Sequence, residues 1–167
     1  MPPIIRHAES TDLAAVKAIY AAASVYANTL QLPYQSDAKW QGLFVPQPGF
    51  YNLVAEVEGQ VVGQLGLQVM QNARRRHVAE IGMGVAEAYQ GQGIGSALLR
   101  AALDMADNWL ALRRVELLVY SSNEPAIALY ERFGFEVEAE LTDYAFQYGK
   151  YINALQKMKK DYGSKVK

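Results

Sequence analysis

The sequence predicts a mixed α/β fold. Its 167 residues match the usual length of one domain and are enough to bury a hydrophobic core. Of these residues 51% are hydrophobic and 20% are charged, as in ordinary globular proteins. The expected strands and helices do not alternate regularly, and neither a repeat nor a linker divides the chain. A mixed sheet is therefore favoured over a fully parallel, doubly wound one, and residues 1–167 are expected to form a single domain.

The first fifty residues combine one strand and one helix with an irregular segment. Ile4 to His7 are expected to form a strand. Thr11-Asp12 offers a helix N-cap before apolar residues that recur at helical spacing, namely Leu13, Val16, Ile19 and Tyr20. Residues 24–50 carry scattered aromatic residues and prolines, which predict loops around one short helix after Ser36-Asp37.

Three strands and a long helix are expected in the middle of the chain. Leu53 to Val57 and Val61 to Val69 flank Glu58-Gly59, a pattern typical of a β-hairpin. A third strand covers Val78 to Val85. The amphipathic helix that follows places a set of apolar residues on one face: Ile94, Leu98, Leu99, Ala102, Met105, Ala106 and Trp109.

The last third of the chain predicts a buried strand, a second helix and a pair of strands. Val115 to Tyr120 form an almost continuous apolar run, as expected of a strand covered on both faces. Asn123 to Phe133 predict a helix that Gly134 ends in the left-handed conformation. Residues 135–158 are expected to form two strands joined around Tyr148-Gly149-Lys150, and the lysine-rich residues 159–167 a frayed tail. The whole chain thus predicts about seven strands and about four helices.

Charge and composition argue against several functional classes. The 16 basic and 17 acidic residues give a formal net charge of -1, which predicts no nucleic-acid partner and no membrane partner. Without cysteine, the chain has no disulfide, thiolate metal site or cysteine nucleophile. His7 and His77 have no partner at metal-ligand spacing, so no metal is expected. With no signal-peptide pattern and no apolar run of about 20 residues, a cytoplasmic location is expected.

A glycine-rich loop joins the third predicted strand to the long helix. Gly91, Gly93 and Gly95 alternate between the strand that ends at Val85 and the helix that begins near Ile94. Free N–H groups and the positive end of the helix dipole would face such a loop, and glycine lets a phosphate approach the backbone. The loop therefore predicts an anion site, with a purely connecting turn as the alternative.

Two common nucleotide-binding signatures do not fit this loop. A dinucleotide fingerprint needs a third glycine three places after the second, where Ser96 or Leu98 stands. The G-x-x-x-x-G-K-[ST] sequence of phosphate-binding loops is absent. A different phosphate-bearing ligand is therefore expected.

Two motifs in the second half of the chain resemble the motifs of one known family. The loop contains Gln90-x-x-Gly93-x-Gly95, and the next helix contains Asn123-x-x-Ala126-x-x-Leu129-Tyr130-x-x-x-Gly134-Phe135. The first resembles the Q/R-x-x-G-x-G/A signature of the GNAT superfamily of acetyl-CoA-dependent N-acetyltransferases, although Glu87 stands where a proline is common. The second is similar to that family's N-x-x-A-x-x-L-Y-x-x-x-G-F helix. The resemblance implies a mostly antiparallel, twisted sheet of about seven strands with about four helices on both faces.

The resemblance also implies a site for acetyl-CoA. The strand before the loop would splay from its neighbour and offer backbone groups of Met83 and Val85 to the pantetheine arm, while the loop holds the pyrophosphate. Asn123 would contact the cofactor near its thioester. The implied acetyl-CoA-binding residues are Met83, Gly84, Val85, Gln90, Gly91, Gln92, Gly93, Ile94, Gly95, Ser96, Asn123, Ala126 and Tyr130.

Tyr130 is the first candidate catalytic residue. The resemblance implies direct attack of an amine on the thioester, with a backbone N–H near Val85 stabilising the oxyanion and the Tyr130 hydroxyl directed at the sulfur. Tyrosine has a pKa of ~10 and a simple thiol ~8.5, so full proton transfer is uphill by about 2 kcal/mol in water. Hydrogen-bond donation to the thiolate is the minimum role, and a purely structural core tyrosine is the alternative.

Glu80 is the second candidate catalytic residue. It lies on the strand before the loop, amid Val78, Ala79 and Ile81. A partly buried carboxylate in such a place suits proton abstraction from the amine. The alternative is a glutamate at the strand edge that pairs with Arg74, Arg75 or Arg76.

The acceptor is expected to be a primary amine. The chain is similar to bacterial amino-acid N-acetyltransferases of this superfamily at Val25 to Pro33, Ser36-Asp37 and Trp40, which favours the α-amine of a free, apolar or aromatic L-amino acid. Tyr26, Leu32, Tyr34 and Trp40 are the candidates for a side-chain pocket, because loops on a rigid scaffold carry recognition. The alternatives are acetylation of a polyamine, an antibiotic or a protein N-terminus, and a non-catalytic acetyl-CoA-binding module. Exposed strand edges in residues 135–158 suggest a homodimer.

Overall fold

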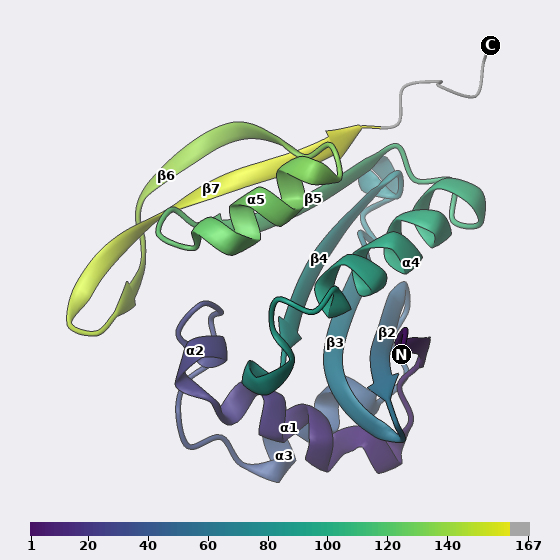
Figure 1. Ribbon diagram of the computed structural model, residues 1–167. Helices are drawn as coiled ribbons and strands as arrows, with labels where there is room; N and C mark the ends of the chain where they lie inside the picture. Colours follow the sequence, from purple (N-terminus) through teal and green to yellow (C-terminus); the bar gives the residue numbers. More distant parts are fainter. Residues whose placement is uncertain (161–167) are drawn as a thin grey trace.

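The computed structural model, which describes residues 1–160, contains one twisted sheet of seven strands (Figure 1). The strands are β1 (Ile4–His7), β2 (Phe50–Val57), β3 (Gln60–Val69), β4 (Val78–Val85), β5 (Arg114–Tyr120), β6 (Glu136–Gln147) and β7 (Lys150–Lys160). Their order is β1-β2-β3-β4-β5-β7-β6, and every neighbouring pair is antiparallel except β4 and β5. The expectation of a mostly antiparallel sheet of about seven strands is confirmed.

Five α-helices accompany the sheet: α1 (Leu13–Ala21), α2 (Ala23–Tyr26), α3 (Asp37–Gln41), α4 (Ile94–Asn108) and α5 (Glu124–Arg132). The sequence predicts about four. The additional helix is α2, a single turn that the extended backbone of Ala22 separates from α1. Because α2 has only four residues, it carries too little periodicity to be recognised in the irregular segment.

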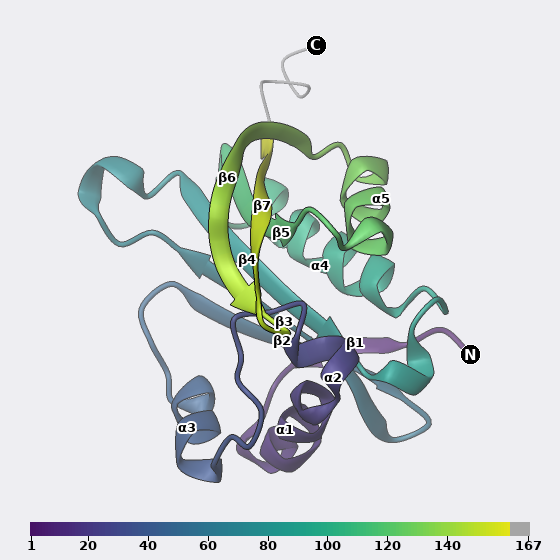
Figure 2. The ribbon, with the colours of Figure 1, turned by 90° about the vertical axis from the view of Figure 1, so that its left-hand side faces the viewer.

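Helices cover both faces of the sheet and bury a separate core on each (Figure 2). The larger core lies under α4 and α5, where Leu98 and Leu99 pack against Leu65 of β3. The smaller core contains Val16 and Tyr20 of α1. Trp109 does not belong to the buried face of α4, since it leaves helical geometry at the C-cap and is 79% exposed.

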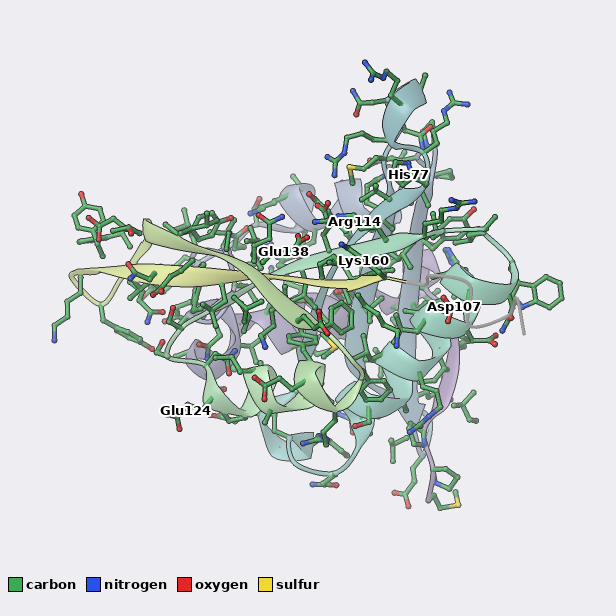
Figure 3. The ribbon with its side chains drawn as sticks, turned by 90° about the horizontal axis from the view of Figure 1, so that it is seen from above. His77, Asp107, Arg114, Glu124, Glu138 and Lys160 are labelled. Atoms are coloured by element: carbon green, nitrogen blue, oxygen red, sulfur yellow. The ribbon has the colours of Figure 1, made fainter. Side chains whose placement is uncertain are left out.

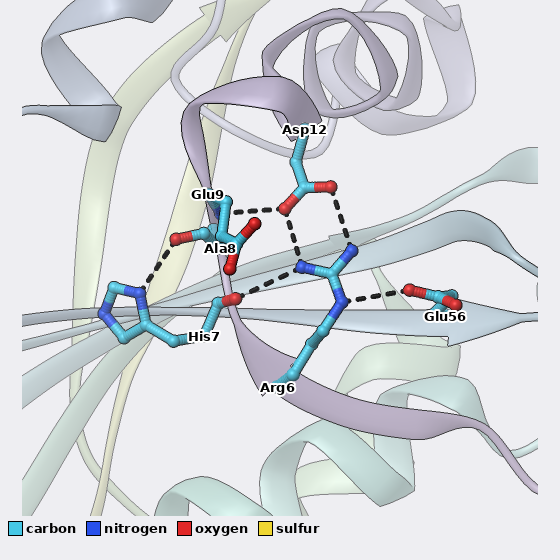
Figure 4. Close-up of polar contacts among 6 residues, drawn as sticks. All are labelled: Arg6, His7, Ala8, Glu9, Asp12 and Glu56. Carbon is cyan, nitrogen blue, oxygen red and sulfur yellow. Dashed lines mark hydrogen bonds and ion pairs between the residues drawn. The ribbon is translucent and has the colours of Figure 1, made fainter.

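Asp12 has a different role from the expected helix cap. Its buried carboxylate accepts two hydrogen bonds from Arg6, at 2.8 and 2.9 Å, and one from the Glu9 N–H at 2.8 Å (Figure 4). Arg6 also donates to Glu56 of β2. No side-chain cap of α1 forms within the described chain. Asp12 therefore ties the start of α1 to β1 and β2.

The ends of the predicted elements are mostly confirmed, with one correction. Glu58-Gly59 and Tyr148-Gly149 form two-residue turns with positive φ, and Gly134 has φ 88 after α5. The tail is expected to begin at residue 159, but Lys159 and Lys160 pair with β5 as part of β7, and the other residues of the expected tail lie outside the described ones. No helix within residues 1–160 is long and apolar enough to cross a membrane.

Candidate active site

The candidate active site is a cleft between β4 and β5. The two strands pair over only three positions, from Val78–Arg114 to Glu80–Glu116, and then diverge. The cleft has a volume of about 1180 Å³. That volume exceeds the 300–1,000 Å³ or so of a typical single-ligand pocket. It offers room for two substrates at once.

Charged residues surround the end of the cleft where β4 and β5 are still paired. Glu80 and Glu116 lie side by side in the register of β4 and β5. Glu116 accepts from Arg75 at 2.8 Å and from Arg114 at 2.6 Å, and Arg114 also pairs with Glu138. Figure 3 shows Arg114 and Glu138 together over β5, β6 and β7. Arg114 thereby holds the pKa of Glu138 below its usual value.

Glu80, in contrast, presents a free carboxylate to the cleft. It is exposed rather than partly buried, and within residues 1–160 its carboxylate has neither an ion pair nor a hydrogen bond. The alternative pairing with a nearby arginine is not found, since Arg75 binds Glu116 instead. The geometry allows Glu80 to attract a cationic amine, and its role as a base stays a prediction.

The backbone of β4 faces the open side of the cleft at the expected residues. The Ala86 N–H donates to the Val62 carbonyl at 2.8 Å. Because antiparallel strands alternate between hydrogen-bonded and non-hydrogen-bonded pairs, Met83 and Val85 point their backbone groups away from β3. The Val85 carbonyl accepts from the Gln90 side chain at 3.1 Å. The Val85 N–H stays free of β3 and is directed toward the cleft.

The glycine loop forms the end of the cleft at α4. Gly91 and Gly93 have φ values of 73 and 84, which only glycine adopts at low cost, and a Cβ on either would meet open space. Gly95 instead allows close packing, because its Cβ would lie 3.2 Å from Leu129. Of the loop residues expected to bind acetyl-CoA, Gln92 does not line the cleft; its side chain donates to the Ala88 carbonyl.

The N-terminus of α4 meets the requirements of a phosphate site. Its first internal hydrogen bond runs from the Ala97 N–H to the Gly93 carbonyl, so the N–H groups of Ile94, Gly95 and Ser96 precede the helical ladder. No described side chain caps them, and the first turn holds no acidic residue. These donors and the helix dipole together favour a phosphate group.

Helix α5 places Tyr130 and Asn123 on the same cleft. Asn123 caps the helix, accepting from the Ala126 N–H at 3.4 Å. Tyr130 is 7% exposed and packs edge-on against Phe135, and its hydroxyl has no hydrogen-bond partner in the described part of the chain. Burial raises its pKa to about 12. The hydroxyl therefore keeps its proton at neutral pH and is available as a donor in the cleft.

The side of the cleft formed by α1 and α2 contains residues that the sequence analysis does not assign to the site. Tyr20, Ser24 and Asn28 line it. The Tyr120 hydroxyl of β5 donates to the Thr29 carbonyl at 2.8 Å and holds this segment across the cleft. Ser24 Oγ is buried without a partner among residues 1–160. Helical periodicity marks Tyr20 only as an apolar core position, so its polar role leaves no signal in the sequence.

The residues predicted to form the acceptor pocket lie mostly outside this cleft. Tyr26, Leu32 and Tyr34 line a second cavity of about 410 Å³ next to α1. Trp40 is buried between the two and lines both, stacked on Tyr20 with ring centroids 5.0 Å apart. Tyr20 and Trp40 are the residues that line both cavities, and a role of the second cavity in binding stays a prediction.

Comparison with known proteins identifies the family. Residues 14–135 match the model of the Acetyltransferase (GNAT) family, and this span is more than half of the chain. The chain belongs to the GNAT family. As a member, it is an N-acetyltransferase that uses acetyl-CoA, in agreement with the sequence motifs.

Similar GNAT proteins act on different acceptors. The chain is 44% identical over 151 residues to the L-amino acid N-acetyltransferase AaaT of Escherichia coli, covering 90% of this chain and 93% of the relative. A solved ribosomal-protein-alanine N-acetyltransferase from Brucella melitensis is 30% identical, with a TM-score of 0.84 and coverage of 95% and 99%. The spermidine N-acetyltransferase of Vibrio cholerae, solved with CoA and spermine, has 24% identity, a TM-score of 0.85 and 95% coverage of each chain. The family fixes the donor chemistry, while the acceptor differs between its members.

Proposed function

We propose that this GNAT protein acetylates the α-amine of a free L-amino acid. The observation that carries the proposal is the divergence of β4 and β5, which opens one cleft from the glycine loop through to Glu80 and α1. The similarity to an L-amino acid N-acetyltransferase over 90% of the chain supports this choice of acceptor. Acetyl-CoA would occupy the side of α4 and α5, and the amine the side of α1.

The residues present suit acetyl-CoA, which supplies an activated acetyl thioester. The free N–H groups of Ile94, Gly95 and Ser96 would bind the pyrophosphate. The exposed backbone of Met83 and Val85 would pair with the amides of the pantetheine arm. Tyr130 would donate to the sulfur from α5, where its raised pKa keeps the proton in place.

The reaction then needs no covalent enzyme intermediate. The amine nitrogen forms a bond to the acetyl carbon, the carbon–sulfur bond breaks, the nitrogen loses one proton and the sulfur gains one. The Val85 N–H, which has no partner on β3, would donate to the charge that develops on the thioester oxygen. Glu80 would attract the ammonium form and take up its extra proton before attack, directly or through water, which frees the lone pair. The proton that the neutral amine then loses as the amide forms balances the one that the sulfur gains.

A single free carboxylate favours an acceptor with one amine over a polyamine. Within residues 1–160 the acidic residues that line the cleft are Glu80 and Glu116. Two arginines neutralise Glu116, so only Glu80 can pair with a cationic substrate. A polyamine needs several such partners, because each of its ammonium groups loses water when it binds.

The test is release of free thiol from acetyl-CoA, measured over all common amino acids, spermidine, spermine, an aminoglycoside and an alanine-terminated peptide. We expect the highest kcat/KM with a free L-amino acid, and little turnover with its D-enantiomer or its N-methyl derivative. A polyamine or the peptide as the best acceptor would overturn the choice of substrate. Thiol release that no amine accelerates above the rate of hydrolysis would overturn the proposed transfer to nitrogen.

A homodimer and a cytoplasmic location stay predictions. In the described sheet β6 is an edge strand, and several large apolar residues on β6, β7 and the turn between them are exposed: Val137, Phe146, Tyr148 and Tyr151. Such a surface suits contact with a second copy. Sedimentation of the full chain, compared with the double variant F146S/Y151S, would test whether this surface forms a dimer.

A further inference from the structure

A chain of buried hydrogen bonds crosses the smaller core and ends at Tyr20. Asn52 Nδ2 donates to the Leu43 carbonyl at 3.2 Å, Gln64 Nε2 donates to Asn52 Oδ1 at 2.9 Å, and the Tyr20 hydroxyl donates to Gln64 Oε1 at 2.6 Å. Asn52 and Gln64 are each 3% exposed. The chain thus links α1, β3 and β2 to the backbone after α3.

One backbone carbonyl fixes the direction of every bond in this chain. The Leu43 carbonyl can only accept, so Asn52 must present its amide NH₂ to it and its oxygen to Gln64. Gln64 must then present its own NH₂ to Asn52 and its oxygen to Tyr20. Tyr20 has a single proton and has to donate it to Gln64. The lone pairs of the Tyr20 oxygen are all that remain for other partners.

The Tyr20 oxygen lies next to Gly84 of β4, in the part of the cleft where the proposed transfer would take place. A Cβ on Gly84 would be 3.1 Å from it, and Tyr20 lines the cleft with Glu80 and Tyr130. Burial, and to a smaller extent the nearby Tyr130 hydroxyl, raise the pKa of Tyr20, so it keeps its proton. Stacking on Trp40 fixes the ring. The hydroxyl is therefore an oriented acceptor that cannot turn around to donate.

Tyr20 and the phosphate site lie on opposite faces of the sheet. Tyr20 belongs to the core under α1, whereas Ile94 of the α4 N-terminus belongs to the other core (Figure 2). A cofactor held at the α4 N-terminus would therefore approach Gly84 from the side of α4 and α5. The group that meets the Tyr20 oxygen thus comes from the acceptor side, and it must carry a hydrogen to donate.

We propose that Tyr20 is a specificity-determining residue that accepts a hydrogen bond from the acceptor amine. This inference rests on the proposed function and deepens it. A primary amine that donates one N–H to Tyr20 keeps its lone pair for the thioester carbon. Gln64 and Asn52 are positioning residues that set the direction of the Tyr20 hydroxyl.

The first test is Tyr20→Phe, which keeps the ring on Trp40 and removes the oxygen. We expect kcat/KM for the amine to fall about tenfold, mainly through KM, the size of effect expected from one hydrogen bond. The dissociation constant for acetyl-CoA should not change, which also shows that the variant is folded. Unchanged amine kinetics in this variant would overturn the inference, while thiol release by the wild type upholds the proposed function independently.

The second test separates the direction of the Tyr20 hydroxyl from the stability of the protein. Asn52→Asp and Asn52→Leu both remove the bond to Leu43, but the aspartate oxygen still accepts from Gln64, whereas leucine frees Gln64 to rotate. We expect the KM for the amine to rise in Asn52→Leu and to stay near the wild-type value in Asn52→Asp, even if both melt at lower temperature. An equal rise in KM in both variants would overturn the positioning role. If the wild type acetylates no amine, the proposed function and the inference fall together.

Discussion

Tyr20 packs directly over Gly84, so that a Cβ on Gly84 would lie 2.9 Å from two atoms of the ring. The backbone of Gly84 is ordinary extended strand, so the glycine serves close packing and not an unusual φ. We expect Gly84→Ala to push the ring aside and lose about 1–3 kcal/mol of unfolding free energy, as overpacking does. Gly82→Ala is the matched control, since its Cβ would meet open space on the same strand. Urea unfolding checks both, and equal stability of the two variants would contradict the packing.

The α4 N-terminus should respond to a new charge in two opposite ways. Ser96→Asp places a carboxylate in the first turn of α4, where the helix dipole favours it and stabilises the free protein by about 0.3–1 kcal/mol. The same carboxylate repels a phosphate, so we expect acetyl-CoA to bind at least tenfold more weakly. Calorimetry of binding and of unfolding measures the two effects, with Ala18→Glu on the exposed side of α1 as the control. Unchanged affinity for acetyl-CoA would exclude the phosphate site.

Tyr130→Phe should separate turnover from binding. The change removes the hydroxyl and keeps the ring against Phe135, so we expect kcat to fall at least tenfold with little change in acetyl-CoA binding. Because burial raises the pKa of Tyr130 to about 12, its ionisation should not limit kcat below about pH 11. Tyr51→Phe, outside the cleft, is the matched control. A wild-type kcat in Tyr130→Phe would exclude the donor role.

Glu80→Gln should weaken binding of the amine more than binding of acetyl-CoA. The carboxylate is exposed in the cleft and has no partner among residues 1–160, so its negative charge is available to a cationic amine. We expect the KM for the amine to rise several-fold and the pH–rate profile to change, while acetyl-CoA affinity stays constant. Glu136→Gln, on the exposed edge strand β6, removes the same charge elsewhere. A profile identical to that of the wild type would remove Glu80 from the mechanism.

Local sequence signals predict the elements of this fold, and long-range contacts explain what they miss. Gly59, Gly134 and Gly149 each adopt the positive φ that their turn or helix end requires, so their positions predict the ends of elements. The glycine loop is predicted in the same way. The role of Tyr20 depends instead on Gln64 and Asn52, which lie 44 and 12 residues along the chain from their partners. No periodicity in the sequence encodes that pairing.

Asp12 is a second case in which a contact with another element of the structure overrides a local sequence signal. Next to a predicted helix its carboxylate suits a cap, but a cap competes with the stronger, charge-assisted bonds that Arg6 offers from β1. The hydrogen bonds from Arg6, and then that from Glu9, hold the pKa of Asp12 below its ordinary value of 3.8. This network has a consequence for acid stability.

Asp12→Asn should cost stability at neutral pH and little in acid. A carboxyl whose pKa is lowered by folding stabilises the native state above its unfolded pKa, and this contribution is lost as the pH falls through the folded pKa. We expect the variant to lose about 1–3 kcal/mol at pH 7, because Arg6 loses a buried ionic partner, and the difference from wild type to shrink below about pH 4. Urea unfolding at pH 7 and pH 3 measures this difference in stability.

Asp37→Asn is the control. It breaks an exposed pair with Lys17 and should cost less than about 1 kcal/mol at either pH. An equal loss for Asp12→Asn at both pH values would show that the Asp12 charge does not stabilise the fold.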